Sequence, residues 1–147
     1  MILRKATSND AEACADILRG WMNENDWYDT PHKPDEDVPF LTSLIVGGWT
    51  TVADEDGVKG FLVQDKSWIN CLYLAPEARG QGVGKRLLCQ AKNTHPEGLQ
   101  LWTFQANTDA HRFYIREGFR EVERTDGSGN DEKLPDIRFV WRMFHET

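Results

Sequence analysis

The sequence predicts one α/β domain over residues 1–147, built on a single mixed sheet of seven strands with four helices. Apolar residues recur with a period of two in some segments and of three to four in others, as strands and helices require. A helical segment also joins the strand segments at residues 67–75 and 99–104. Such a crossover makes two strands parallel neighbours in one sheet. A chain of 147 residues is long enough to bury one core.

The composition excludes several classes of protein. Hydrophobic residues at 39% and charged residues at 28% are typical of a soluble globular protein. The net charge of −7, without a basic stripe, argues against a nucleic-acid partner. No apolar run approaches the roughly 18 residues of a membrane span and no leader pattern opens the chain, so we expect a cytoplasmic protein with no membrane partner.

The cysteines and histidines show no metal-binding spacing, so no metal is expected. Cys14, Cys71 and Cys89 lie inside periodic segments. We interpret all three as reduced thiols of the core.

A short strand and a helix open the chain. Residues 2–6 read as the strand, and Asn9 with Glu12 matches a capping box at the start of a helix. Apolar residues then recur at helical spacing, at Cys14, Ile17, Leu18 and Trp21. The sequence therefore predicts a first helix with one apolar face.

A polar segment separates this helix from the next one. Residues 24–37 are acidic and contain Pro31 and Pro34, which predicts a loop. A second helix is expected over about residues 35–45 and ends at Gly47 and Gly48. Four of its residues are expected to point inward: Val38, Leu41, Leu44 and Ile45.

A β-hairpin and a third strand follow. Residues 49–53 and 58–63 flank an Asp-Gly pair, which is a strong hairpin signal. Gly60 inside the second of these strands predicts a bulge. The next strand, at residues 67–75, stops at Pro76, which has no N–H to donate.

The C-terminal third alternates strands and a helix. A strand at residues 99–104 precedes a helix at about 108–117, which stops at Gly118. A strand at residues 119–124 and an acidic, turn-rich loop at 126–133 come next. In the last strand, apolar residues at Ile137, Phe139, Trp141 and Met143 alternate with Arg138 and Arg142.

A glycine-rich turn joins the strand at residues 67–75 to the third helix. Gly80, Gly82 and Gly84 stand where the helix begins, so unpaired N–H groups and the positive end of the helix dipole face outward. Glycines let this backbone approach a ligand closely, and such sites bind phosphate. We expect a side chain at Gly82 or Gly84 to intrude on that ligand, and Lys85 to add positive charge.

Three phosphate-binding patterns compete for this turn. A P-loop needs Gly-x-x-x-x-Gly-Lys-Ser/Thr, and Arg79 and Arg86 occupy its first and last positions here. A dinucleotide fingerprint needs a different glycine spacing inside a repeated βαβ unit. The third pattern, Arg-x-x-Gly-x-Gly, is matched by Arg79, Gly82 and Gly84. An ordinary glycine-rich turn is the alternative to all three.

Together with the preceding Leu72-Tyr73-Leu74-Ala75-Pro76-Glu77, the third pattern resembles the acyl-CoA pyrophosphate loop of the GNAT (GCN5-related) N-acetyltransferases. The segment from Asn107 to Phe119 resembles the family's Asn-x-x-Ala-x-x-Phe-Tyr-x-x-x-Gly-Phe motif position by position. The resemblance therefore extends over nearly the whole chain. It implies the GNAT acyl-CoA N-acyltransferase fold, a central mixed seven-stranded sheet flanked by four helices, with strands four and five parallel and splayed.

The resemblance implies acetyl-CoA (coenzyme A) as the cofactor. The loop backbone would cradle the pyrophosphate, and the strand before it would bind the pantetheine arm through its freed backbone groups. Asn107 would also bind the pantetheine, and its alternative role is that of a helix N-cap. The cofactor-binding residues so implied are Leu72, Tyr73, Leu74, Arg79, Gly80, Gln81, Gly82, Val83, Gly84, Lys85 and Asn107.

Tyr114 is the candidate catalytic residue, because the family's tyrosine at this position protonates the leaving thiolate. A phenol with a pKa near about 10 can do so. Burial in the core is the alternative role for Tyr114. The strand at residues 67–75 lacks the carboxylate that serves many members as general base. The remaining candidates for the base are His32, His111, Glu36, Glu132 or a water relay.

The acidic segment at residues 24–37 suits a cationic, partly apolar amine, although a solvated face is the alternative. The residues expected to bind the acceptor are Trp27, His32, Asp35 and Glu36. Neutralising Asp35, Glu36 and Asp37 together should then raise the acceptor KM.

We therefore expect an acyl-CoA-dependent N-acetyltransferase that moves an acetyl group from acetyl-CoA to a primary amine by direct attack. A small amine, a protein N-terminus and a lysine side chain all stay open as acceptors, and a homodimer stays open as the assembly. The alternative is a non-catalytic acyl-CoA-binding sensor or scaffold on the same fold. The missing strand carboxylate favours this alternative, whereas Asn107 and Tyr114 favour the enzyme.

Overall fold

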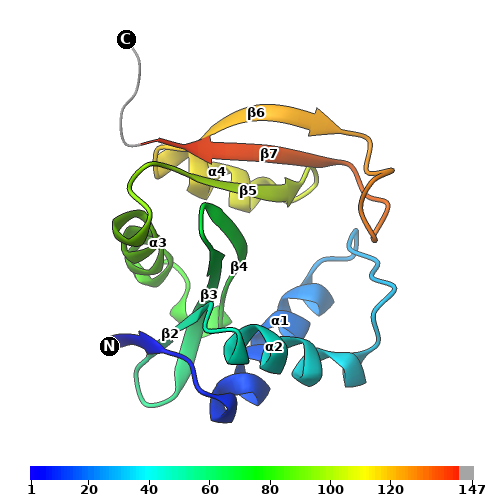
Figure 1. The fold of residues 1–147 in the computed structure, drawn as a ribbon. Helices are drawn as coiled ribbons and strands as arrows, with labels where there is room; N and C mark the ends of the chain where they lie inside the picture. Colours follow the sequence, from blue (N-terminus) through cyan, green and yellow to red (C-terminus); the bar gives the residue numbers. More distant parts are fainter. Residues whose placement is uncertain (143–147) are drawn as a thin grey trace.

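The computed structural model describes residues 1–142, which form one seven-stranded sheet and four α-helices (Figure 1). The strands are β1 (Ile2–Lys5), β2 (Thr50–Asp54), β3 (Val58–Asp65), β4 (Trp68–Leu74), β5 (Leu99–Phe104), β6 (Arg120–Thr125) and β7 (Asp136–Trp141). The helices are α1 (Ala11–Glu24), α2 (Asp37–Val46), α3 (Val83–Thr94) and α4 (Thr108–Arg116), with short 3₁₀ turns η1 (Ser8–Asp10), η2 (Pro34–Glu36) and η3 (Pro76–Ala78). The strand order is β1-β2-β3-β4-β5-β7-β6, and β4 and β5 run parallel. The predicted mixed sheet with four helices is confirmed.

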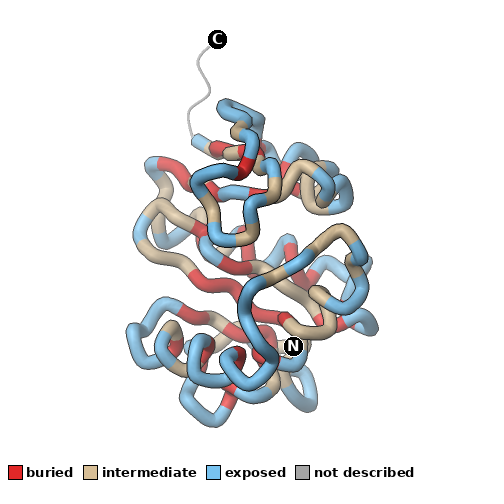
Figure 2. Tube along the Cα trace, turned by 90° about the vertical axis from the view of Figure 1, so that its right-hand side faces the viewer, coloured by how far each residue is buried: buried red, intermediate tan, exposed pale blue. Residues whose placement is uncertain are grey.

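Two apolar cores lie on opposite faces of the sheet. One lies beneath α1 and α2, and the other beneath α3 and α4. The first contains Cys14, Leu18, Leu41, Phe61 and Val63, and the second contains Leu62, Leu87, Leu88, Tyr114 and Phe139. Successive residues of β3 thus point into different cores, as the pleat of a central strand requires. Figure 2 shows these buried segments running through the middle of the molecule.

The parallel strands β4 and β5 separate after their first residues. Trp68 faces Gln100 in the single register position that joins them, and the Gln100 N–H donates to the Ser67 carbonyl at 2.8 Å. Beyond it no residue of β4 pairs with β5, so the strands diverge toward Leu74 and Phe104. The predicted splay is confirmed, and it leaves strand backbone unpaired inside the sheet.

Two irregularities shape the strands beside this opening. A register shift between Val63 and Gln64 leaves Asn70 as an extra residue on β4. A second shift lies next to Gly60, where a bulge was predicted. A Cβ at Gly60 would lie 2.5 Å from the Leu74 Cδ2 atom, so glycine lets β3 and β4 approach closely at this point. The extra residue Asn70 and the close approach at Gly60 both lie where β3 packs beside β4.

Two predictions near the helix starts are wrong. The capping interaction before α1 joins Thr7 and Asp10 instead of Asn9 and Glu12, because the turn η1 comes first, and the Thr7 N–H donates to Asp10 Oδ2 at 2.8 Å. In α2, Val38 is 41% exposed, although it was expected to point inward. Asp37 is buried in its stead, since Arg19 binds both of its carboxylate oxygens at 2.7 and 2.8 Å.

The prediction of three core thiols is wrong for Cys89, which is exposed, whereas Cys14 and Cys71 are buried. The buried face of α3 consists of Val83, Gly84, Leu87, Leu88 and Ala91. This stripe leaves Cys89 outside it, because residues one or two positions apart point in different directions from a helix. The predicted contribution of Met143 to the last strand lies outside the described residues.

Candidate active site

A cavity of about 580 Å³, the glycine-loop cleft, runs along both predicted motifs. Its walls come from β4, the loop before α3, the helix α4 and the end of α1. The predicted site residues that line it are Leu72, Tyr73, Leu74, Arg79, Gly80, Gly84, Asn107 and Tyr114. Segments that lie far apart in the sequence thus meet around one hollow beside the splayed strand.

The glycines of the loop do not all face this hollow in the same way. Gly80 and Gly82 have φ angles of 74° and 82°, and a Cβ on either would meet no atom within 4 Å. Open space therefore adjoins the N-terminus of α3, which Gly82 caps. At Gly84 a Cβ would lie 3.4 Å from the Phe113 ring, because α3 packs there against α4. A side chain at Gly84 would therefore press on Phe113, and its effect on a bound ligand stays a prediction.

The other predicted loop residues lie beside the cleft without lining it. The Gln81 side chain donates to the Glu77 carbonyl at 2.8 Å, and the Val83 side chain is buried in the core. Lys85 is exposed on the first turn of α3. The backbone of Gln81, Gly82 and Val83 is thus the part that can face an anion, since helix N-termini carry unpaired N–H groups.

Tyr114 lines the glycine-loop cleft and is almost completely buried. Tyr114 is 7% exposed, and its hydroxyl makes no hydrogen bond to any residue from 1 to 142. Burial raises the pKa of this phenol well above its ordinary value. Tyr114 therefore carries its proton at neutral pH and holds it unshared beside the cleft.

Asn107 is the N-cap of α4, one of the two roles that the sequence left open, and its binding of a cofactor stays a prediction. Its side-chain oxygen accepts from the Ala110 N–H at 3.4 Å and so caps α4. The residue also lines the glycine-loop cleft. Because capping uses the oxygen, the amide N–H₂ group stays available for a ligand.

A second cavity of about 570 Å³, the acidic cleft, lies on the α1–α2 side of β4. Tyr73 lines both cavities, so the two clefts meet at this residue. The carboxylates that line the acidic cleft are Glu36, Asp37, Asp131 and Glu132. No Lys or Arg of the described residues lines it. The acidic cleft is therefore suited to a cation.

The acidic residues come from two loops that meet across the cleft. The Tyr28 hydroxyl donates to Glu132 Oε2 at 3.1 Å, and burial raises the pKa of Tyr28 to about 12. His32 Nε2 lies 3.9 Å from Asp131 Oδ2, with both side chains half or more exposed. The loop between α1 and α2 thus contacts the loop between β6 and β7.

Five aromatic side chains bridge the opening between β4 and β5. Tyr73 packs on Trp21, with ring centroids 5.1 Å apart, and Tyr28 packs on Phe104 at 5.5 Å. Trp21 contacts Tyr28, and Trp27 contacts Trp21, Tyr28 and Phe104. The α1–α2 segment is thereby fixed against both strands.

Of the four predicted acceptor residues, His32 and Glu36 line the acidic cleft. Trp27 belongs to the aromatic cluster, and Asp35 is exposed on η2; neither lines the cleft. Sequence reasoning missed Met22, Phe40, Trp102, Phe104 and Asp131, which also line it. For Trp102 and Phe104 a signal was available, because they alternate along β5 with the buried Leu101.

His111, a candidate base, and Cys71, a predicted core thiol, are both packed against neighbouring groups. His111 Nε2 lies 3.0 Å from the Phe104 carbonyl, and the ring packs on Phe139. Cys71 lines the acidic cleft but is 8% exposed, and burial raises the pKa of its thiol to about 12. Its sulfur is therefore protonated and a poor nucleophile at neutral pH.

Comparison with known proteins decides the family. The family model described as "Acetyltransferase (GNAT) domain" matches residues 45–121. This span runs from β2 through α4 and includes β4, which lines both clefts. The chain belongs to the GNAT acetyltransferase family. The predicted family is thereby confirmed, and it is a family of N-acetyltransferases that use acetyl-CoA.

Relatives of this GNAT protein include enzymes named for lysine acetylation. Peptidyl-lysine N-acetyltransferase YjaB of Salmonella typhimurium is 30% identical over 93 residues, which cover 63% of each chain and so less than two thirds of YjaB. Peptidyl-lysine N-acetyltransferase YiaC of Escherichia coli is 27% identical over 147 residues, covering 95% of this chain and 96% of YiaC.

The solution structure of apo-form YjaB from Escherichia coli has the same fold as this GNAT protein. The TM-score is 0.79 at 21% identity, over 96% of this chain and 98% of YjaB.

Among residues 1–142, no helix has both the length and the apolar run needed to cross a membrane.

Proposed function

We propose that this GNAT protein transfers the acetyl group of acetyl-CoA to the side-chain amine of a lysine in a peptide or protein. One observation carries the proposal: the glycine-loop cleft and the acidic cleft meet at Tyr73, from opposite sides of β4. A donor in the first cleft and a cation in the second can therefore reach the same point. Two relatives named as peptidyl-lysine N-acetyltransferases support the lysine acceptor.

The glycine-loop cleft fits the donor. Space lies open above Gly80 and Gly82, where a bulky side chain would otherwise stand, and the N-terminus of α3 favours a phosphate there. The unpaired edge of β4 can hydrogen-bond an amide-containing arm as a neighbouring strand would. When bound, acetyl-CoA supplies a thioester carbonyl that a neutral amine can attack.

Tyr114 is placed to deliver the proton that the leaving thiolate needs. Its phenol stays protonated because burial raises its pKa, and a thiolate held in the same cleft is the base that can accept this proton. An N–H of the unpaired β4 edge would hydrogen-bond the acyl oxygen, where negative charge develops. Both groups are fixed by packing and need no rearrangement.

The acidic cleft both attracts a lysine and opposes its deprotonation, because carboxylates raise the pKa of a nearby ammonium. A base is therefore required. Among the described residues β4 supplies none, and its bulge places Asn70 in the cleft. Glu132 is the best-placed base, because Tyr28 binds one of its oxygens and leaves the other to accept a proton. His32, which is half exposed, is the second candidate.

The experiment is release of free thiol from acetyl-CoA in the presence of matched amines. One peptide has a single lysine and a blocked N-terminus, the same peptide with acetyl-lysine has a free N-terminus, and a small diamine completes the set. We expect turnover of the first peptide, with the acetyl group on lysine by mass spectrometry. Turnover of the free N-terminus or of the diamine, without turnover of the lysine peptide, would overturn the lysine assignment. Tight CoA binding by calorimetry without turnover of any amine would indicate a sensor or scaffold.

A further inference from the structure

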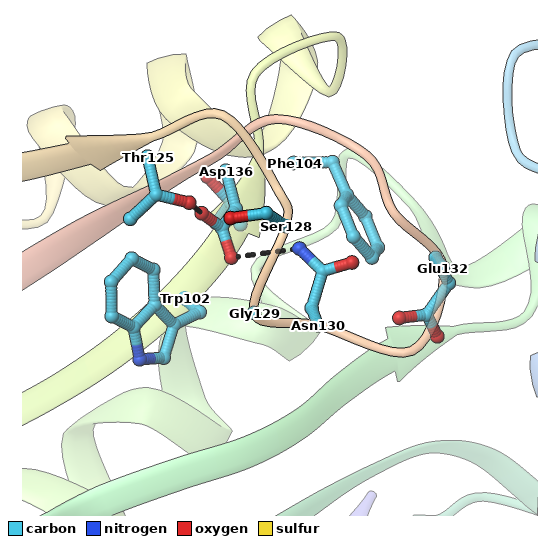
Figure 3. A pocket seen from close by; sticks show the side chains of 9 residues that line it. Trp102, Phe104, Thr125, Ser128, Gly129, Asn130, Glu132 and Asp136 are labelled. Atoms are coloured by element: carbon cyan, nitrogen blue, oxygen red, sulfur yellow. Dashed lines mark hydrogen bonds between the residues drawn. The ribbon is translucent and has the colours of Figure 1, made fainter.

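A third cavity, the Trp102 pocket, adjoins the acidic cleft and has a volume of about 580 Å³ (Figure 3). Its floor comes from β5 through Trp102 and Phe104, and its rim comes from the loop between β6 and β7. Trp102 is 41% exposed, which leaves a large indole surface open to a ligand. Exposed aromatic rings in a concave wall are typical of binding sites.

The Trp102 pocket and the acidic cleft are neighbouring cavities. Trp102, Phe104 and Glu132 line both of them. A ligand whose amine enters the acidic cleft therefore has the pocket next to it, on the other side of these three shared side chains. This arrangement suits an extended chain better than a compact amine.

The charged side chains that line the Trp102 pocket are acidic. Glu132 and Asp136 line it, and no Lys or Arg of the described residues does so. Lys133 is nearby, but its ammonium donates to the Ser128 carbonyl at 2.9 Å, within the loop. Asp136 accepts from Asn130 at 3.1 Å and from the Thr125 hydroxyl, which holds the loop in place without cancelling the charge.

We infer that the Trp102 pocket is a second subsite, which binds the cationic side chain of a lysine or arginine close to the acceptor lysine in the same peptide. The inference rests on the proposed function. An indole face attracts ammonium and guanidinium groups, and a carboxylate at the rim adds a partner for the same charge. An acidic residue beside the acceptor lysine would be repelled by Glu132 and Asp136, because no lysine or arginine among residues 1–142 lines the pocket. Peptides with such a residue are therefore disfavoured.

The first test compares peptides that differ only beside the acceptor. A short alanine-rich peptide with one lysine and a blocked N-terminus is compared with versions in which arginine, glutamate or leucine replaces each alanine in turn. At one or two positions, arginine should raise kcat/KM about tenfold over alanine, as expected for a desolvated cation–aromatic contact. Glutamate should lower it there.

The second test changes the pocket. Ser128→Lys adds a positive charge at the rim, and Ser128→Gln adds similar length without charge. Ser128 is exposed, so both variants should fold. Ser128→Lys should abolish the arginine preference and leave the alanine peptide unchanged, whereas Ser128→Gln should keep it. Trp102→Leu should reduce the preference at least threefold through loss of the indole face.

Binding without turnover separates this inference from the proposed function. Calorimetry with the acetyl-lysine forms of the arginine and alanine peptides reports the subsite even if no peptide is acetylated. Equal affinities and equal kcat/KM values for both peptides would overturn the subsite and leave the lysine acetyltransferase standing. If leucine raised kcat/KM more than arginine did, the pocket would bind apolar residues beside the acceptor lysine instead of cationic ones.

Discussion

The Arg79 guanidinium donates two hydrogen bonds to the Glu24 carboxylate, at 2.7 and 3.0 Å. One of the same nitrogen atoms lies 3.3 Å from the Leu74 carbonyl. The end of α1 is thereby joined to the glycine loop across the mouth of the glycine-loop cleft. The pairing raises the pKa of Arg79 and lowers that of Glu24. An arginine implied in cofactor binding is thus already engaged by a carboxylate of the chain.

Replacing Glu24 should release Arg79 for an anionic ligand. We expect Glu24→Gln to tighten CoA binding by roughly two- to fivefold, because both partners are partly exposed and such pairs are weak. Glu12→Gln is the control, since it removes the same charge from an exposed position of α1. Calorimetry measures both. Weaker CoA binding by Glu24→Gln alone would mean that the ion pair positions Arg79 for the cofactor.

Charge at Gly82 should distinguish an anion site from an ordinary turn. Asp and Asn both tolerate the left-handed backbone that Gly82 adopts, with φ of 82°. Gly82→Asp should weaken CoA binding by roughly 100-fold or more through repulsion, and Gly82→Asn much less. Circular dichroism and thermal unfolding check that both fold alike. Equal affinities of the two variants for CoA would mean that no phosphate of CoA binds at this position.

Loss of the Tyr114 hydroxyl should affect the chemical step and little else. Tyr114→Phe keeps the ring in its buried place, so the fold should be unchanged. We expect kcat to fall by roughly 100-fold and the KM for acetyl-CoA to change little. Phe113→Leu, at the neighbouring position that packs on Gly84, is the control for altered packing. An unchanged kcat in a chemistry-limited assay would leave Tyr114 with a packing role only.

The carboxylates of the acidic cleft should attract the acceptor at low salt. Glu36→Gln with Asp131→Asn removes two charges that line the cleft. The KM for a lysine peptide should rise several-fold at low salt, and less at high salt, where screening acts over about 10 Å or less. The KM for acetyl-CoA should stay constant.

The neutralisation of Asp35, Glu36 and Asp37 suggested by the sequence is not suited to this purpose. Asp37 is 6% exposed and binds Arg19, and Asp35 does not line the cleft. Asp37→Asn alone should lower the free energy of unfolding by about 2 kcal/mol, because Arg19 loses its partner while keeping some contact with water. A change in stability would then be mistaken for a change in binding.

The three cysteines should react at very different rates. Cys89 is exposed and should react with a thiol reagent at once in the native protein, whereas Cys14 and Cys71 should react only on unfolding. Burial raises the pKa of both inner thiols from 9.0 to about 12. Their contribution to stability is therefore fully present below about pH 9 and is lost as the pH rises toward 12. Urea unfolding across this range measures the loss, and Cys89→Ser should not change it.

Some of the site could be predicted because its signals are local. Gly82 and Tyr114 belong to short motifs, and the strand, turn and helix that carry them follow from periodicity and from glycine. The position of Glu132 in the acidic cleft could not be predicted in this way. The hydrogen bond from Tyr28 to Glu132 joins residues 104 positions apart, and no pattern in either loop shows that the loops meet. Asp37 likewise looked like one charge among several, until its contact with Arg19 made it part of the core.

The splay between β4 and β5 divides the sheet into a four-stranded and a three-stranded part that share one rung, at Trp68 and Gln100. The amides along this seam lack the partners that slow hydrogen exchange elsewhere in a sheet. An amide-containing arm lying in the seam would act as a removable strand and would close it. The protein would then be stiffest while its donor is bound and most compliant after its release. The part of the sheet that opens most easily would then be the place where the proposed transfer occurs.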